Sequence, residues 1–245
     1  QVVPVVPRLK RARSAKVMKG RAVTGEEFER MLSALNRLPA RQRPGLRFLL
    51  RGLWLSGLRL GEALLLTWDQ WSDGIRIDAS GKYVKLLIPA EAEKGAKDRT
   101  YPVTPDFAEL LLSVPKEERT GWVFNVEGKR GPTRRADTVS KLIVRIGQGA
   151  GVKVDERNKR TKEGGVERAS VYASAHDLRR AFGLRWARRV MPMVLKELMR
   201  HENVSTTEKY YVEVNADETA ALLDALNGKG APEGAPSRGE GSVKQ

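Results

Sequence analysis

Residues 174–189 read SAHDLRRAFGLRWARR, and this stretch indicates how the C-terminal part of the chain folds. Ser174 and Asp177 have the spacing of a capping box, so a helix is predicted to begin there and to run to about the end of the stretch. His176 then lies in the first turn, where free N–H groups and the helix dipole favour a bound anion and a neutral imidazole. Arg179 follows on the same helix face. The stretch therefore predicts an imidazole and a guanidinium on one side of a helix.

Further helices are predicted on both sides of this stretch, wherever capping signals, prolines and apolar spacing coincide. The expected helices span residues 24–38, 44–56, 60–67, 104–113, 137–147, 192–200, a segment from Ser205 that carries Tyr210, and 217–226.

Between residues 74 and 124 the pattern changes to short strand-like runs separated by Gly, Lys and Asp. The expected strands span 75–78, 83–88, 99–103 and 122–124, with turns near Ser80 and Lys94. Polar residues 153–169 are interpreted as a loop or an exposed hairpin. The sequence therefore predicts an α+β fold that is mostly α with a small antiparallel β-sheet.

The composition limits the classes of function. The chain has 245 residues, no cysteine and two histidines, which excludes thiol catalysis, disulfides and zinc sites built on cysteine. No tight carboxylate constellation is evident either, so we expect neither a metal ion nor another cofactor. The formal charge of +15 predicts a polyanionic partner, and double-stranded DNA is the partner we expect. A soluble basic protein without such a partner is the alternative.

The chain is expected to divide into three parts. Residues 1–21 are basic and without acidic residues, as in a linker or arm. Residues 22–227 are expected to form the folded domain, and the Gly-, Pro- and Ser-rich residues 228–245 a disordered tail. Charged residues interrupt the apolar run 46–68, so it is not expected to span a membrane. The chain begins with Gln1 rather than Met, which suggests a fragment of a longer protein.

If this protein cleaves DNA strands, the residues of its catalytic site must neutralise a phosphodiester whose negative charge increases in the transition state. Such a site needs fixed positive groups, a nucleophile and an acid for the leaving oxygen. Arginine supplies the positive charge through a planar, bidentate fork. Both histidines lie in the last third of the chain, and Tyr210 follows His201 by nine residues. These residues are the candidates for that chemistry.

Five motifs occur in an order and at spacings that resemble the catalytic domain of the tyrosine recombinases, also called phage integrases. The resemblance covers residues 22 to about 215. The motifs are Ser56-Gly-Leu-Arg-Leu-Gly-Glu-Ala-Leu64, Lys94-Gly-Ala-Lys-Asp-Arg99, His176-Asp-Leu-Arg179, Leu198-Met-Arg-His201 and Thr206-Thr-Glu-Lys-Tyr210. Together they are far more specific than any one alone.

The resemblance implies a catalytic role for each matched position. Tyr210 would attack the scissile phosphorus and form a 3′-phosphotyrosine link. His176 would help to take the tyrosine proton, because a free phenol has a pKa near about 10. Lys94 would protonate the departing 5′-oxygen. No metal or nucleotide would be needed, since the phosphotyrosine stores the bond energy for religation.

The resemblance also implies which groups hold the phosphate. Arg59 and Arg179 would bind its non-bridging oxygens, and His201 would donate a hydrogen bond to it. Glu62 would orient the Arg59 side chain without contacting the phosphate itself.

Each position has a structural alternative. Arg59 could be an exposed arginine of an amphipathic helix, His176 a capping residue and His201 a satisfied core histidine. Lys94 competes with Lys97, and the nucleophile Tyr210 competes with its neighbour in the sequence, which points about 100° away around the helix. The spacing from His201 favours Tyr210.

Three features depart from the family's pattern. Met199-Arg200 stands where the family usually has Leu-Gly, and Arg180-Ala181 replaces the common His-Thr. The polar segment 153–169 lengthens the approach to His176. The sequence given is expected to lack the family's N-terminal core-binding domain, apart from the basic residues 1–21, which would be its linker.

The resemblance implies a site-specific DNA recombinase, bacterial or phage-encoded and cytoplasmic. It would act as a homotetramer on DNA, in which a C-terminal segment is exchanged between neighbours, and residues 217–226 are the candidate segment. A helix packed on its own subunit is the alternative for that segment. The rival functions are a catalytically silent DNA-binding homologue and a type IB topoisomerase-like enzyme.

Overall fold

The first helix shows how the local sequence sets an element boundary. Thr24 Oγ1 accepts a hydrogen bond from the N–H of Glu27 at 3.2 Å, and the Glu27 carboxylate accepts one from the N–H of Thr24 at 3.0 Å. This capping box starts α1 (Gly25–Ala34), as predicted. The computed structural model describes residues 20–69, 74–89, 99–128, 131–160, 165–212 and 224.

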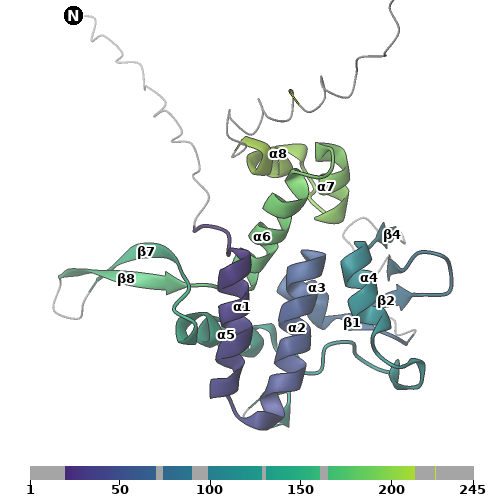
Figure 1. Cartoon of the computed structure of the whole chain (residues 1–245), viewed down its shortest axis with the longest axis horizontal. Helices are drawn as coiled ribbons and strands as arrows, with labels where there is room; N and C mark the ends of the chain where they lie inside the picture. The colour runs from purple at the N-terminus through teal and green to yellow at the C-terminus, as the bar shows by residue number, and fades with distance from the viewer. Residues whose placement is uncertain are drawn as a thin grey trace, which may run out of the picture.

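The described residues form helices interrupted by short strands (Figure 1). After α1, the helices are α2 (Arg43–Ser56), α3 (Leu60–Leu64), α4 (Pro105–Leu112), α5 (Ala136–Gly149), α6 (Ala175–Ala187), α7 (Pro192–Leu198) and α8 (Val204–Val212). The strands are β1 (Leu66–Thr67), β2 (Ile75–Asp78), β3 (Lys85–Ile88), β4 (Arg99–Pro102), β5 (Glu127–Gly128), β6 (Gly131–Pro132), β7 (Lys153–Arg160) and β8 (Val166–Tyr172). Short 3₁₀ turns occur at Leu35–Arg37, Ala40–Gln42 and Lys116–Glu118.

The main core is built around α2, which packs against α4 and α6, while α1 packs against α5. Leu46, Leu49, Leu50 and Leu53 recur at helical spacing and are at most 1% exposed, so α2 has one fully buried face. A second, smaller cluster joins α6, α7 and α8 and consists of Phe182, Ala187, Leu195, Met199 and Tyr210. Figure 1 shows α7 and α8 at one end of α6, apart from the main body.

The principal sheet has the order β1-β2-β3-β4. The β2–β3 and β3–β4 pairs are antiparallel, with Ile77 opposite Leu86 and Leu86 opposite Tyr101. The β1–β2 pair is parallel, with Leu66 opposite Ile75. The prediction of a small antiparallel sheet is therefore confirmed for β2, β3 and β4, and β1 adds a parallel edge strand that was not predicted.

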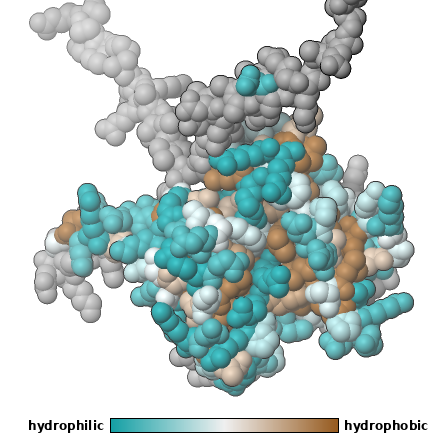
Figure 2. Space-filling view, in the orientation of Figure 1, coloured by the Kyte–Doolittle hydropathy of each residue, from teal (hydrophilic) through white to brown (hydrophobic). Residues whose placement is uncertain are grey.

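The polar segment before α6 forms a hairpin, the second of the two predicted alternatives. Strands β7 and β8 pair from Lys153 opposite Tyr172 to Arg160 opposite Val166. The hairpin projects from the body beside α5 (Figure 1), and its surface is mostly hydrophilic (Figure 2).

Several predicted boundaries are wrong. The helix expected over 60–67 ends at Leu64, because Leu66 and Thr67 are fully buried and pair as β1 instead. The run 122–124 makes only a single bridge, from Trp122 to Thr67. Helix α8 begins at Val204, so Ser205 lies inside the helix and does not cap it.

Thr104 has its predicted place at the start of the helix, but its side chain bonds elsewhere. It stands at the N-cap of α4, but its hydroxyl donates to the Leu55 carbonyl at 2.8 Å and makes no cap hydrogen bond. The hydroxyl therefore ties α4 to the end of α2. Residues 1–19 of the predicted basic arm, the turn at Lys94, the segment 217–226 apart from Asp224, and the tail 228–245 lie outside the described residues.

The start of α1 gives a first prediction. Arg21 donates to both Glu27 oxygens, at 2.5 and 2.7 Å, and this hydrogen bonding lowers the Glu27 pKa from 4.5 to about 2. A lowered carboxyl pKa stabilises the fold above the unfolded value, and the stabilisation is lost as the pH falls through the folded value. Arg21 is 48% exposed, so solvent screening reduces the effect. We expect Glu27→Gln to lower the free energy of unfolding by about 1–2 kcal/mol at pH 7.

Urea unfolding at a series of pH values measures this. The difference between wild type and Glu27→Gln should shrink between pH 4.5 and about 2. Glu29→Gln, an exposed substitution on the same helix, is the matched control and should change little at any pH. A Glu27→Gln deficit that stays constant down to pH 2 would contradict the assignment.

Candidate active site

Arg59 lies at the junction of α2 and α3, and the local backbone explains its position. Gly57 ends α2 with φ 61°, a left-handed conformation, and a Cβ on Gly57 would lie 2.3 Å from the Phe182 ring. Only glycine satisfies both conditions. Glu62, in the first turn of α3, accepts from the Arg59 N–H at 2.8 Å and from Arg59 Nη1 at 2.7 Å. The Arg59 side chain remains 52% exposed, so this guanidinium is held by a carboxylate and is open to a ligand.

Helix α6 presents His176 and Arg179 in different environments. The Asp177 carboxylate accepts from the N–H of Ser174 at 2.9 Å and from its hydroxyl at 2.6 Å, which fixes the start of the helix. His176 is exposed, whereas Arg179 is 3% exposed. Arg179 donates to the carbonyls of Gly57 and Met199. It therefore joins the end of α2 to the end of α7 and lies at the negative end of both helices.

His201 and Tyr210 are neighbours in space. Their rings stack with centroids 6.1 Å apart and planes inclined by 13°. His201 Nδ1 lies 2.9 Å from the hydroxyl of Thr207, so the other ring nitrogen, Nε2, is the one left for a ligand. Tyr210 is 6% exposed and packs on α6, where a Cβ on Gly183 would lie 2.5 Å from its ring. Gly183 therefore makes the room that this tyrosine occupies.

The two histidines are neutral at pH 7. Burial and, after it, the positive charges of Arg179, Arg59 and Arg200 together lower the His201 pKa to about 4. The His176 side chain is exposed, but neighbouring protein atoms remove part of its hydration, which lowers its pKa, and the Arg180 charge is the next cause. Both imidazoles can accordingly accept a proton, the role expected of His176, and either can donate through its remaining N–H.

The arginines remain cationic and outnumber their counter-ions. Burial and, after it, the charges of Arg200 and Arg59 together lower the Arg179 pKa to about 10, so the group stays charged at pH 7. Glu62 carries the carboxylate that binds both Arg59 and Arg200. Three guanidiniums around one carboxylate leave an excess of positive charge, which suits an anionic ligand.

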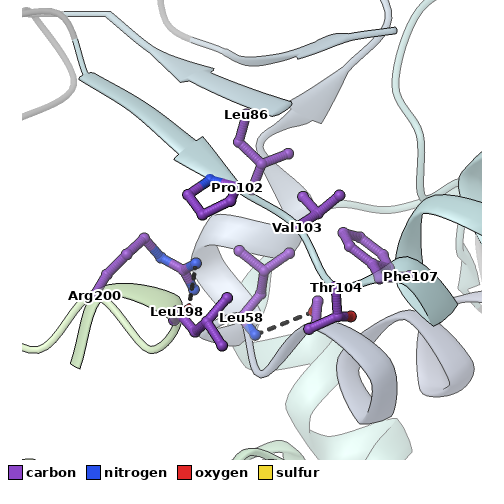
Figure 3. Close-up of a pocket in the computed structure, with 9 residues that line it drawn as sticks. Leu58, Leu86, Pro102, Val103, Thr104, Phe107, Leu198 and Arg200 are labelled. Atoms are coloured by element: carbon purple, nitrogen blue, oxygen red, sulfur yellow. Dashed lines mark hydrogen bonds between the residues drawn. The ribbon is translucent and has the colours of Figure 1, made fainter. Parts of the chain in front are cut away.

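A small pocket borders this site where α2, α4, β3 and β4 meet the end of α7 (Figure 3). Its lining is mostly apolar, including Leu58, Leu86, Phe107 and Leu198, with Arg200 at one side. Its free volume of about 10 Å³ holds no more than a water molecule. A nucleotide would therefore meet the guanidinium and imidazole groups at the surface, not inside this pocket.

The structure brings together most of the predicted residues. Hydrogen bonds, ring stacking or mutual electrostatic effects connect Arg59, Glu62, His176, Arg179, His201 and Tyr210. Lys94 lies outside the described residues, between β3 and β4. Neither the Thr207 hydroxyl nor the Arg200–Glu62 ion pair was predicted. The only signal for Arg200 was its replacement of the expected glycine.

The described residues contain neither a metal-binding cluster nor a membrane-spanning helix. No cluster of three or more His, Cys, Asp or Glu side chains in this part of the chain could hold a metal ion. None of its helices is long and apolar enough to cross a membrane.

Solved structures with similar folds include recombinases and integrases. XerA recombinase matches with TM-score 0.51 and 16% identity, over 87% of this chain and 66% of that one. The Tn1549 transposon integrase in complex with transposon right end DNA matches with TM-score 0.53 and 16% identity, over 86% and 67%. A lambda integrase dimer bound to a COC′ core site matches with TM-score 0.53 and 17% identity, over 82% and 50%. The chain thus spans about half to two thirds of the length of these proteins.

The fold is therefore that of the tyrosine recombinase catalytic domain. Residues 21–218 match the sequence model of the Phage integrase family, and the chain belongs to that family. No curated protein gives a significant sequence match.

Proposed function

We propose that this chain is the catalytic domain of a site-specific DNA recombinase, which cleaves and rejoins DNA strands through a 3′-phosphotyrosine intermediate. The observation that carries the proposal is the convergence of Arg59, Arg179, His201 and Tyr210 from four separate segments onto one region of excess positive charge. A merely basic surface would not require a buried arginine, a neutral histidine and a tyrosine at the same place.

In the proposed reaction the Tyr210 phenol oxygen attacks the scissile phosphorus as its proton passes to the His176 imidazole. The bond between phosphorus and the 5′-oxygen breaks, and that oxygen takes a proton from Lys94 and leaves as a hydroxyl. Religation runs the same steps in reverse with the 5′-hydroxyl of another strand, so the number of phosphodiester bonds is conserved. The neutral His176 supports its role as the acceptor.

Arginines and His201 would stabilise the charge that develops on the phosphate. Arg59, half exposed and held by Glu62, would bind one non-bridging oxygen. Arg179 uses two of its five N–H groups on backbone carbonyls, which leaves three for the phosphate. His201 would donate from Nε2, because Nδ1 faces Thr207. We expect no metal ion or nucleotide to take part.

The wider organisation follows from the same proposal. Residues 22–227 would form the catalytic domain, residues 1–21 a basic linker that follows the DNA, and residues 228–245 a tail. Recombination would take place in a homotetramer on double-stranded DNA in the cytoplasm of a bacterium. Arg21 supports the start of the domain, since it pairs with Glu27 and donates to the Lys153 carbonyl at 2.7 Å.

Covalent capture tests the proposal directly. The 245-residue chain is mixed with labelled duplexes whose central positions are randomised and whose cleaved strand is nicked a few nucleotides 3′ of that window. Cleavage releases a short 5′-hydroxyl fragment, which diffuses away and traps the phosphotyrosine. We expect an adduct that resists SDS, forms undiminished in EDTA and enriches particular sequences.

The same assay separates the rival functions. Binding of the duplexes without any adduct would overturn the proposal in favour of a silent DNA-binding homologue. An adduct formed equally on all sequences would indicate a topoisomerase-like enzyme. Loss of the adduct in EDTA would show that the charge is supplied by a metal ion and not by arginine.

A further inference from the structure

Arg200 occupies a backbone position that usually belongs to glycine. Helix α7 ends with the N–H of Arg200 donating to the Glu197 carbonyl at 2.9 Å and the N–H of His201 donating to the Lys196 carbonyl at 3.0 Å. These two hydrogen bonds form a Schellman motif, whose left-handed residue is here Arg200 with φ 51°. Arg200 is the one non-glycine residue with positive φ among those that the structure describes. Its side chain therefore has to compensate for a backbone cost that glycine avoids.

The Arg200 side chain offsets this backbone cost by forming a buried ion pair with Glu62, the residue that also binds Arg59. The Arg200 side chain is only 8% exposed, and its Nη2 donates to Glu62 Oε2 at 2.9 Å. Nη1 donates to the Leu198 carbonyl at 3.1 Å, which keeps the side chain against its own turn (Figure 3). The other oxygen of Glu62 accepts from Arg59 Nη1 at 2.7 Å. One carboxylate thus bridges a buried arginine and a half-exposed one.

Resting on the function proposed above, we infer that Arg200 is a positioning residue for Arg59: it fixes the Glu62 carboxylate that aims the Arg59 guanidinium at the phosphate. Arg200 directly precedes His201, so the same ion pair also joins α3 to the turn that carries this histidine. The Arg200–Glu62 ion pair therefore fixes the positions of Arg59 and His201 relative to each other, although the two residues come from distant segments of the chain.

The charges around Glu62 support this assignment. Burial tends to raise the Glu62 pKa, and the Arg200 charge is the largest of the influences that oppose burial and keep this pKa below its usual value. Hydrogen bonds from Arg59 act in the same direction. Arg179 and His201 also lie within electrostatic range of Glu62, but Arg200 pairs with it directly. Without Arg200, Glu62 would take up a proton at a higher pH and release Arg59.

The variants Arg200→Gly and Arg200→Lys test the inference. Glycine suits the left-handed turn, so Arg200→Gly should stay folded although the ion pair is lost. We expect its adduct formation in the capture assay to slow about tenfold at pH 7, and the acid limb of its pH–rate profile to move to higher pH. Arg200→Lys keeps the charge and should hold the acid limb near its wild-type position while recovering part of the rate.

The path through Glu62 is checked by combining changes. In a Glu62→Gln background, Arg200→Gly should slow the reaction little further, because the carboxylate it fixes is gone. A carboxyl titration followed by NMR should show a higher Glu62 pKa in Arg200→Gly than in wild type. Full additivity of the two changes, or a wild-type rate and pH profile in Arg200→Gly, would overturn the inference.

A failure of the proposed function has a different signature. It would appear as a wild-type chain that forms no adduct at all, whatever residue 200 is. In that case the role in catalysis falls with it, while the titration still reports whether Arg200 controls the ionisation of Glu62.

Discussion

Tyr210→Phe should abolish the covalent adduct, with a fall in rate on the order of a thousandfold or more, because the substitution removes the attacking oxygen and keeps the aromatic ring. The ring remains to fill the space against Gly183 and to stack on His201. Folding should therefore be nearly unchanged, within about 1 kcal/mol. DNA binding should persist, since the arginines are intact. The measurements are single-turnover adduct formation, a gel-shift assay and urea unfolding on the same preparation.

Tyr211→Phe is the matched control, because it removes the neighbouring phenol from the same helix. Tyr211 donates its hydroxyl proton to the Val190 carbonyl at 2.6 Å, a contact that anchors α8 to the turn before α7. We expect this variant to lose about 1 kcal/mol of stability and to keep most of its activity. An adduct that survives in Tyr210→Phe and disappears in Tyr211→Phe would reassign the nucleophile.

Local signals in the sequence predicted the helix starts, because capping is decided within four residues. The boxes at Thr24 and Ser174 both start helices in the structure, and each satisfies N–H groups that the helix leaves free. The motif spacing likewise placed His176 and Arg179 on α6 and His201 and Tyr210 close together. These features depend on short separations along the chain, which the sequence displays directly.

Contacts between distant segments were not predictable in the same way. Leu66 and Thr67 continue the apolar pattern of α3 in the sequence. In the structure they leave the helix and pair with Ile75 and Arg76 as strand β1, and this pairing depends on where β2 lies. The sequence predicts that Arg179 lies on α6, but not that it donates to carbonyls 122 and 20 residues away. The Arg200–Glu62 pair spans 138 residues and occurs where the family pattern has glycine. Such pairings are set by how α2, α6 and α7 pack, which depends on the whole core.

Arg59→Ala and Arg179→Ala should both slow adduct formation by about 100-fold or more, but only the second should destabilise the fold strongly. Arg59 is half exposed and contacts Glu62, so its loss should cost about 1 kcal/mol or less. Arg179 is 3% exposed, and its loss leaves the Gly57 and Met199 carbonyls without their donor and a cavity behind it. We expect a cost of about 2–4 kcal/mol.

Urea unfolding and single-turnover adduct formation, measured on both variants, separate binding of the phosphate from support of the fold. Arg51→Ala, which truncates an exposed arginine of α2, is the matched control and should change neither quantity appreciably. Arg179→Lys makes the test more specific. A lysine keeps the positive charge, but it lacks the planar guanidinium that can donate to two carbonyls and a phosphate at the same time. If Arg179→Lys reacted at the wild-type rate, the guanidinium geometry would be irrelevant. If Arg59→Ala were as unstable as Arg179→Ala, Arg59 would be a structural residue, and the division of roles between the two arginines would be wrong.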